Sequence, residues 1–400
     1  MRHKVRALIP LSAVLLLSGL VLAACGGGSK SGGEGGGSDS GSTGAAQLAA
    51  VNKIVKGLFT KEGTFSSPPT TAPKPKAGTN VWLISCGQSI SICSHPIGAA
   101  EEAAASLGWN STTFDDKGEP AKASEGIRSA IADHADVIYD FYIDCRYIQG
   151  ALKQAKAAGI LLVGADVTDC GESNAGSENL FDYITTYSGN LTKAKKGEES
   201  YLDHIRAWGA SLALWSIQET EGHADALIYQ DNVGYGDRVL AHATLEAYEK
   251  YCPECEAEII VFPYSALETG MQERVRQDLL KNPKVNVLNP TYDTIAIAGL
   301  VAGAEASGRD LLINSGEGDE AGVNLTREGK LGAGSGWSLE WDSWAALDAA
   351  NRLMNGEEPQ PTGMGLQMFD KERNLGPSGP WNPPYDYAAI YKKAFEGGEG

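Results

Sequence analysis

Polar and charged side chains that could hold a small hydrophilic molecule recur directly after short apolar runs of the sequence. Asp144 and Arg146 follow the run that ends at Tyr142, and Asp166 follows the run that ends at Ala165. Carboxylates accept hydrogen bonds, arginine donates them in a fork, and Trp or Tyr offers a flat face to C–H groups. This combination predicts a binding site for a polyol or a similar small polar molecule. The candidates are Gln88, His95, Asp144, Arg146, Asp166, Asp231, Asn232, Arg238, Tyr292, Asp293, Glu317 and Trp337.

Each candidate also has an ordinary structural alternative. Asp293, which precedes Thr-Ile-Ala, and Asp237 are typical of helix N-caps, and any loop residue could simply face water. The number of acids leaves a second ligand class open, because buried carboxylates raise one another's pKa unless cations balance them. Arg146 and Arg238 balance only part of that charge. A cationic or amino-bearing solute would suit the acidic candidates, which are Asp144, Asp166, Asp231, Asp293 and Glu317.

The alternation of strands and helices predicts how these side chains are positioned. Residues 80–85 have the apolar, β-branched composition of a buried strand, and residues 97–107 carry one apolar stripe of a helix. Such units repeat to about residue 186, and a second series begins near residue 202. The pattern predicts an α/β fold with two doubly wound parallel-sheet lobes. In such sheets the loops at the carboxyl ends of the strands line the ligand crevice.

Catalytic motifs are missing from the sequence. It contains no GxSxG, no HExxH and no Walker loop, and the glycine run at 332–336 does not match GxGxxG. We therefore predict no catalytic residue, no cofactor and no metal site. The formal net charge of −18 argues against nucleic acid or an anionic lipid surface as a partner.

The first residues resemble a bacterial lipoprotein signal. Arg2, Lys4 and Arg6 precede an apolar stretch that ends in Leu-Ala-Ala-Cys25. The resemblance implies cleavage before Cys25, lipidation of that cysteine and a location on the outer face of the cytoplasmic membrane. Loss of these three positive charges would take the formal charge from −18 to −21. A plain secretory signal is the alternative.

A tether and a linker follow the lipidation signal. Residues 26–44 are mostly Gly and Ser, and a flexible coil of that length typically reaches ~25 Å, which suits a domain held off a bilayer. Residues 45–78 end in a Pro-rich stretch, and we expect them to be a linker or a strap on the domain surface.

Six further cysteines in an exported chain favour disulfides, with fifteen pairings open. We expect pairing in chain order, because the first two share a loop, the next two follow successive strands and the last two form CxxC. A zinc or redox role for the CxxC is the alternative. The cysteines are Cys86, Cys93, Cys145, Cys170, Cys252 and Cys255.

Signal, tether and two α/β series together resemble a type I solute-binding protein of an ABC importer, of the ribose-binding-like sugar branch. Gly-Ile-Leu-Leu-Val-Gly-Ala-Asp166 resembles the family strand that ends in an acid at the cleft. Tyr292-Asp293-Thr-Ile-Ala resembles the family's Asn-Asp-x-x-Ala, and the strand ending at Glu317 stands where the family has Gly-Phe-Asp-Gly. Asn355-Gly-Glu-Glu-Pro is similar to its Lys-Gly-Glu-x-Pro segment.

This resemblance implies two lobes that close by a hinge of three crossovers. We expect the crossovers near residues 183–188, 337–340 and 361–365. Lobe one would then comprise 79–186 and 338–361, and lobe two 187–337 and 362–371. Residues 372–400 would form a peripheral tail with a short helix at 387–395.

The functional prediction is a membrane-anchored, monomeric solute-binding protein that hands a sugar or similar solute to an ABC permease. Two alternatives remain: a sensor subunit that reports ligand to a signalling partner, and an extracytoplasmic hydrolase.

Overall fold

The computed structural model describes residues 40–89, 91–191, 199–232 and 234–397. The predicted signal segment, Cys25 and most of the tether lie outside these residues. Within the described ranges, none of the helices combines the length and the apolar character needed to cross a membrane.

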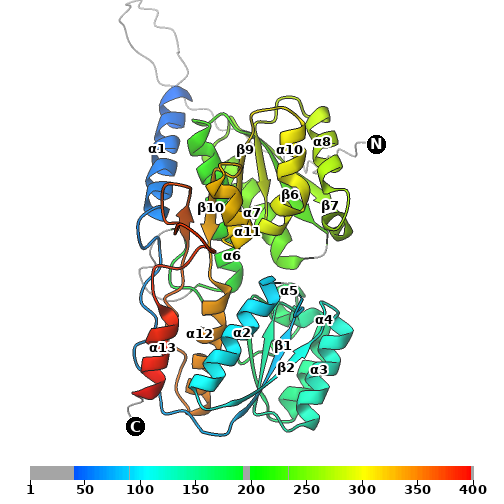
Figure 1. Ribbon diagram of the computed structural model, residues 1–400, viewed down its shortest axis with the longest axis vertical. Coiled ribbons are helices and arrows are strands. Elements are labelled where there is room, and N and C mark those ends of the chain that lie inside the picture. The colour runs from blue at the N-terminus through cyan, green and yellow to red at the C-terminus, as the bar shows by residue number, and fades with distance from the viewer. Residues whose placement is uncertain (1–39, 90, 192–198, 233, 398–400) are drawn as a thin grey trace, which may run out of the picture. The chain divides into compact units, whose positions relative to one another are not determined.

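Lobe one is built on a five-stranded sheet in the order β2-β1-β3-β4-β5, in which all pairs are parallel. Alanine and isoleucine side chains of α3 and α4 form the core on one face, and α2 packs with α12 on the other (Figure 1). The elements are β1 (Asn80–Ser85), α2 (Ser91–Ser106), β2 (Asn110–Asp115), α3 (Pro120–Ala132), β3 (Val137–Phe141), α4 (Cys145–Ala157), β4 (Leu161–Ala165), α5 (Cys170–Ser173) and β5 (Tyr183–Ile184).

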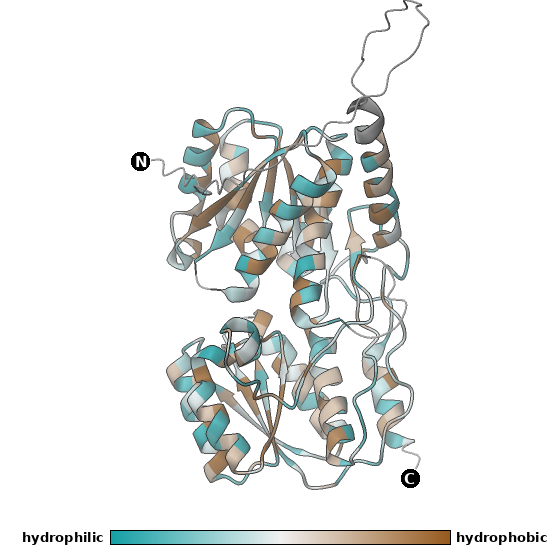
Figure 2. Ribbon diagram, turned by 180° about the vertical axis from the view of Figure 1, so that it is seen from behind, coloured by the Kyte–Doolittle hydropathy of each residue, from teal (hydrophilic) through white to brown (hydrophobic). Residues whose placement is uncertain are grey.

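Lobe two has a six-stranded sheet in the order β11-β10-β9-β8-β6-β7, parallel except for the β10–β11 pair. Apolar residues are concentrated in β6 and β7, whose hydrophobic stretches are visible in the strands of this lobe (Figure 2). The elements are α6 (Tyr201–Glu219), β6 (Asp225–Asp231), α7 (Tyr235–Tyr251), β7 (Glu256–Phe262), α8 (Met271–Lys281), β8 (Val287–Pro290), α9 (Asp293–Ile295), α10 (Val301–Ala306), β9 (Leu312–Glu317), α11 (Glu320–Arg327), β10 (Ala333–Gly336) and β11 (Gln367–Phe369).

The chain passes between the two sheets at three places. It leaves lobe one after β5, returns between β10 and α12 (Leu339–Met354), and leaves again before β11. The predicted α/β fold with two parallel-sheet lobes is confirmed, and in the two described sheets the edge strand β11 pairs antiparallel with β10.

Two helical segments of lobe two differ from what the sequence pattern predicts. Residues 294–306, where that pattern predicts one helix, are interrupted at Gly299, whose φ is 142°. A Cβ there would lie 2.7 Å from the backbone nitrogen of Gln272, so the position requires glycine. Helix α11 was not predicted, because its eight residues follow a glycine-rich turn and carry a short apolar pattern.

The terminal segments contribute to the core, unlike the expected linker or surface strap and peripheral tail. The short helix predicted at 387–395 is confirmed. Helix α1 (Ser40–Leu58) packs on α6 and buries Val51, Val55 and Leu58. At the other end, α13 (Tyr387–Glu396) packs on α2 and α12, with Tyr391 and Phe395 buried. Both segments therefore contribute apolar contacts that hold the lobes in place.

Three disulfides join the six described cysteines in chain order, which confirms the expected pairing. They are Cys86–Cys93, Cys145–Cys170 and Cys252–Cys255. The first closes the loop after β1, and the second joins the loops after β3 and β4. Two of the three thus fix loops at the carboxyl edge of the sheet in lobe one.

Replacing Leu58 by alanine tests whether α1 belongs to the core. Leu58 is fully buried, so Leu58→Ala should lower the free energy of unfolding by about 2–4 kcal/mol, measured by denaturant titration. Lys53→Ala, on an exposed position of the same helix, should change it by less than about 0.5 kcal/mol. Equal, small effects of both variants would contradict the packing described.

Candidate functional site

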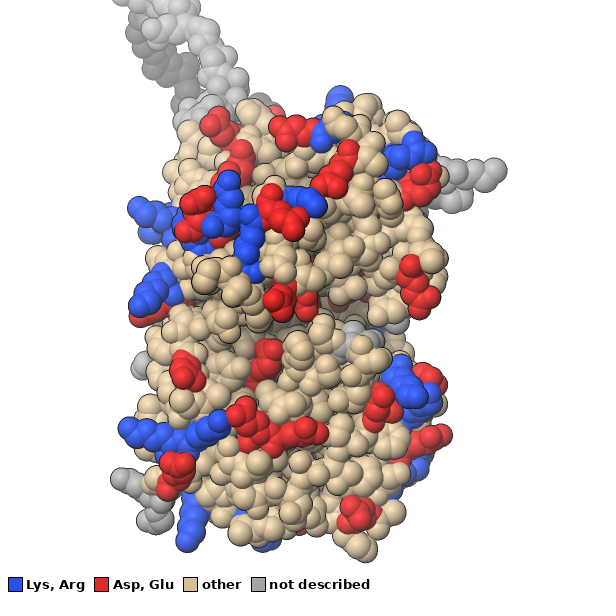
Figure 3. Space-filling view, in the orientation of Figure 1, with Lys and Arg blue, Asp and Glu red and all other residues tan. Residues whose placement is uncertain are grey.

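The carboxyl edges of the two sheets face each other, and their loops touch. Ser91 Oγ in lobe one donates to Asp319 Oδ2 in lobe two at 3.2 Å, and the hydroxyl of Tyr235 lies 3.5 Å from the carbonyl oxygen of Glu172. The space-filling view shows acidic side chains bordering the middle of the hollow between the lobes (Figure 3). These two contacts join loops of the two lobes beside the interlobe cleft.

Three non-glycine residues with left-handed backbones stand where strands end at the cleft. They are Tyr142 after β3, with φ 82°, Asp166 after β4, with φ 54°, and Glu317 at the end of β9, with φ 73°. Such conformations are uncommon for side-chain-bearing residues and cluster at functional sites. Two of the three, Asp166 and Glu317, are among the predicted site residues.

Asp166 and Glu317 bring carboxylates of the two lobes close together. The hydroxyl of Tyr201, the first residue of α6, donates to Asp166, so this acid bridges the lobes. Burial, together with the charge of Asp144, raises the pKa of Asp166 to about 7. Burial and the carboxylates of Asp293 and Asp166 raise the pKa of Glu317 well above its ordinary value.

Two of the predicted acids hold loops in place. Asp144 accepts from the backbone nitrogen of Thr168 at 2.9 Å and from its hydroxyl at 2.5 Å, which joins the loops after β3 and β4. Asp293 accepts from the backbone nitrogens of Gly316, Gly318 and Asp319 at 3.0–3.1 Å. Asp293 is therefore the support of the loop that presents Glu317.

Asp231, Asn232 and Tyr292 lie together at the end of β6. The hydroxyl of Tyr292 donates to Asp231 at 2.8 Å, and Asp231 also accepts from the backbone nitrogen of Gly234 at 2.9 Å. Asn232 is exposed and accepts from the backbone nitrogen of Tyr264 at 3.1 Å. Across the cleft, the phenol of Tyr142 lies within the fields of Asp166 and Asp231.

The two predicted arginines meet over one tyrosine. The guanidinium carbons of Arg146, from lobe one, and Arg238, from lobe two, lie 5.2 and 5.1 Å from the centre of the Tyr235 ring. Arg146 also lies over Tyr147 at 4.4 Å. These cation–π contacts place positive charge at one side of the cleft.

Trp337 lies in a buried aromatic group at the second crossover. Its ring contacts those of Tyr187, Tyr201, His204 and Trp208, and it is only 4 % exposed. Trp337 is thus chiefly a hinge residue whose exposed edge reaches a cavity, rather than an open platform. Of the remaining candidates, Gln88 and His95 are exposed near the start of α2, and Gln88 donates to Ser85 Oγ at 2.7 Å.

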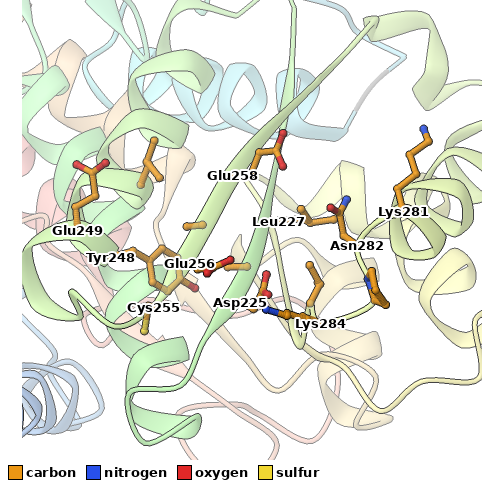
Figure 4. A pocket seen from close by; sticks show the side chains of 15 residues that line it. Asp225, Leu227, Tyr248, Glu249, Cys255, Glu256, Glu258, Lys281, Asn282 and Lys284 are labelled. Carbon is orange, nitrogen blue, oxygen red and sulfur yellow. The ribbon is translucent and has the colours of Figure 1, made fainter. Parts of the chain in front are cut away.

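Two cavities differ in their relation to the cleft. One of about 570 Å³ lies at the amino ends of β6 and β7, where Asp225, Glu256 and Lys284 surround it (Figure 4). None of the predicted site residues lines this cavity, and it lies at the opposite edge of the sheet from the carboxyl ends of the strands. A smaller cavity of about 240 Å³ lies at the cleft and is lined by His95, Glu317 and Trp337, among others.

Sequence reasoning missed several tyrosines at the cleft, namely Tyr142, Tyr201, Tyr235 and Tyr264. Tyr142 is the last residue of a predicted strand and Tyr235 lies between glycines, so position along the chain offered a signal for these two. Among the described residues, the group with metal-ligand geometry is Cys145, Asp169 and Cys170, and its two thiols form a disulfide.

The buried acids predict a fall in stability as the pH rises. Burial raises the pKa of Asp116, Asp166 and Asp293 from 3.8 to about 7, so the folded protein holds more protons than the unfolded chain between pH 4 and 7. The melting temperature should therefore be higher at pH 5 than at pH 7.5. Asp116→Asn should reduce this loss of stability by about 1–3 kcal/mol, because Asp116 is fully buried. Glu125→Gln, at an exposed position of α3, is the control, and an unchanged pH profile for Asp116→Asn would contradict the assignment.

No protein-family model matches the sequence, and no curated protein matches it. Several solved structures match the structure of this chain. An ABC sugar transporter subunit from Rhodobacter sphaeroides matches at 17 % identity and a TM-score of 0.61, over 74 % of this chain and 99 % of that one. An ABC transporter periplasmic solute-binding protein from Actinobacillus succinogenes with bound D-allose matches at 18 % identity and a TM-score of 0.59, and the match covers 74 % of this chain and 98 % of that one. The periplasmic binding protein of the arabinose ABC transporter from a Shewanella species, bound to L-arabinofuranose, matches at 18 % identity and a TM-score of 0.59. The match covers 80 % of this chain and 96 % of that one.

At these identities the likeness concerns the architecture, and it extends over nearly the whole of each matched structure. The fold is that of the type I periplasmic binding proteins, and the structures it resembles are binding subunits of sugar transporters.

Proposed function

We propose that this protein is an extracytoplasmic solute-binding protein of an ABC importer that captures a sugar or a similar small polar solute between its lobes. The observation that carries the proposal is the meeting of polar side chains from both carboxyl edges in one cleft. Catalysis is not part of the proposal, because two of the cleft acids, Asp144 and Asp293, hold loops.

The donor and acceptor set of the cleft suits hydroxyl groups. Asp166 and Glu317 provide acceptors from opposite lobes, and Arg146 provides donors from lobe one. The tyrosines of the cleft provide both roles and flat faces for C–H groups. D-Allose and L-arabinofuranose, the ligands of two matched structures, are molecules of this class.

Lobe closure would convert ligand binding into a signal for a membrane partner. Binding between two hinged lobes favours the closed form by the difference in affinity of the two forms for the solute. We infer that an ABC permease recognises this closed form, and that lipid on Cys25 keeps the monomeric protein at the outer face of the membrane.

Binding of neutral sugars should raise the melting temperature. A sugar present at 100 times its Kd stabilises the folded form by about 2.7 kcal/mol, which is a rise of several degrees in a thermal-shift scan over aldoses and polyols. Asp166→Asn should weaken binding about tenfold, because asparagine tolerates the left-handed backbone but loses the charge.

Glu125→Gln, on the outer helix α3, is the control for that scan and should bind as the unchanged protein does. An Asp166→Asn protein that binds as tightly as the control would remove Asp166 from the site. A scan with no stabilising sugar, polyol or amine would count against the proposal as a whole.

The proposed anchor depends on one thiol. Cys25→Ser should move the protein from the membrane fraction to the soluble fraction, because the acyl chains have no other attachment point in a lipoprotein signal. Ser29→Ala, in the adjacent tether, should leave the distribution unchanged. The lipid anchor would be contradicted if the Cys25→Ser protein stayed in the membrane fraction. It would also be contradicted if the Cys25→Ser and Ser29→Ala proteins were both found in the soluble fraction.

A further inference from the structure

The smaller cavity at the cleft has an unusual lining. It lies between the start of α2, the loop after β9, the second crossover and the C-terminal segment, and its volume is about 240 Å³. Four acids line it, and no lysine or arginine does so among the residues that the structure describes. The acids are Glu317, Asp319, Glu320 and Glu340, and the aromatic side chains are Trp337, Trp381 and Tyr387.

The C-terminal segment supplies one wall of this cavity and is held firmly. The backbone nitrogen of Trp381 donates to the carbonyl oxygen of Gly318 at 3.0 Å, and its indole nitrogen donates to Gln367 Oε1 at 2.9 Å. A Cβ on Gly336 would lie 2.4 Å from the Trp381 ring, so glycine at that position allows the indole to lie against the sheet. Trp381 is 5 % exposed and thus forms a fixed wall.

Among the described residues that line the cavity, the imidazole of His95 is the basic side chain beside the four acids. Asp293 is satisfied by three backbone nitrogens, whereas Glu317 has the backbone nitrogen of Asp293 as its donor and lies in the fields of Asp293, Asp166 and Asp319. The arginines of the cleft lie over Tyr235, which is outside the residues that line the cavity. A positive group in the cavity would relieve the repulsion between these carboxylates.

We propose that the cavity receives a cationic group, a protonated amine or a quaternary ammonium, carried by the solute. This inference rests on the proposed function and makes the ligand an amino sugar or an amino-bearing polyol. Aromatic faces and carboxylates attract such a group together, through cation–π and charge-assisted contacts. The volume is below the about 300–1,000 Å³ of whole-ligand sites, so the cavity takes one end of the solute while the cleft takes its hydroxyls.

Matched neutral and cationic sugars test the proposal by isothermal titration calorimetry on the purified protein. The pairs are D-glucose with D-glucosamine and D-galactose with D-galactosamine, the amines being protonated at pH 6.5. The amino sugar of at least one pair should bind about 10–100 times more tightly than its neutral partner, the range of one charge-assisted contact. Glu317→Gln should abolish that ratio, by weakening binding of the amino sugar more than binding of its neutral partner.

Two further variants complete the test. Glu340→Gln, at a partly exposed position, should reduce the same ratio without risk to folding, and Glu256→Gln, at the remote cavity of lobe two, should leave it unchanged. Tighter or equal binding of the neutral sugars would overturn the cationic subsite and leave the proposed function standing. An affinity ratio that neither Glu317→Gln nor Glu340→Gln changes would do the same. Absence of binding by both members of both pairs would count against both.

Discussion

The arrangement of the two lobes depends on one buried carboxylate. Asp342, in the first turns of α12, accepts from the hydroxyl of Tyr187 at 3.0 Å and from the indole nitrogen of Trp337 at 3.0 Å. Tyr187 belongs to the first crossover and Trp337 to the second, so a single acid joins both connections between the lobes. Because Asp342 is fully buried, loss of either donor would leave part of its carboxylate unsatisfied, and such a group is costly in the interior.

The same region explains why positive charge is scarce at the centre of the molecule. His204 is stacked on Tyr187 at 3.9 Å, and burial lowers its pKa to about 3, so it is neutral under ordinary conditions. The donors that stabilise Asp342 are therefore neutral hydroxyl and indole groups. Neutral donors thus join the two crossovers and add no positive charge beside the cleft acids.

The sequence allowed the fold to be predicted because apolar periodicity and turn residues repeat in every unit, as in β1 and α2. It did not allow the roles of individual acids to be assigned. Asp144 is positioned by Thr168, which is 24 residues away, and Asp293 by nitrogens that are 23–26 residues away. Such partners depend on how loops meet in space, and no local pattern identifies them.

Local sequence patterns also did not predict how the two ends of the chain pack. Residues 45–78 carry proline and lysine typical of a linker, yet Phe65 is fully buried and stacks on Trp341 at 5.6 Å. Trp381 follows a glycine- and proline-rich stretch that resembles a loose tail, yet it lies against Phe369 and forms a cavity wall. In both cases one aromatic side chain supplies enough buried area to fix an otherwise polar segment.

Helix α1 follows the tether directly in the chain and packs on α6, a helix of lobe two. Any force transmitted along the N-terminal segment therefore reaches lobe two first. If acyl chains fasten Cys25 in the bilayer, as proposed, lobe two would be the stationary half, and lobe one would be the half that moves when the lobes open.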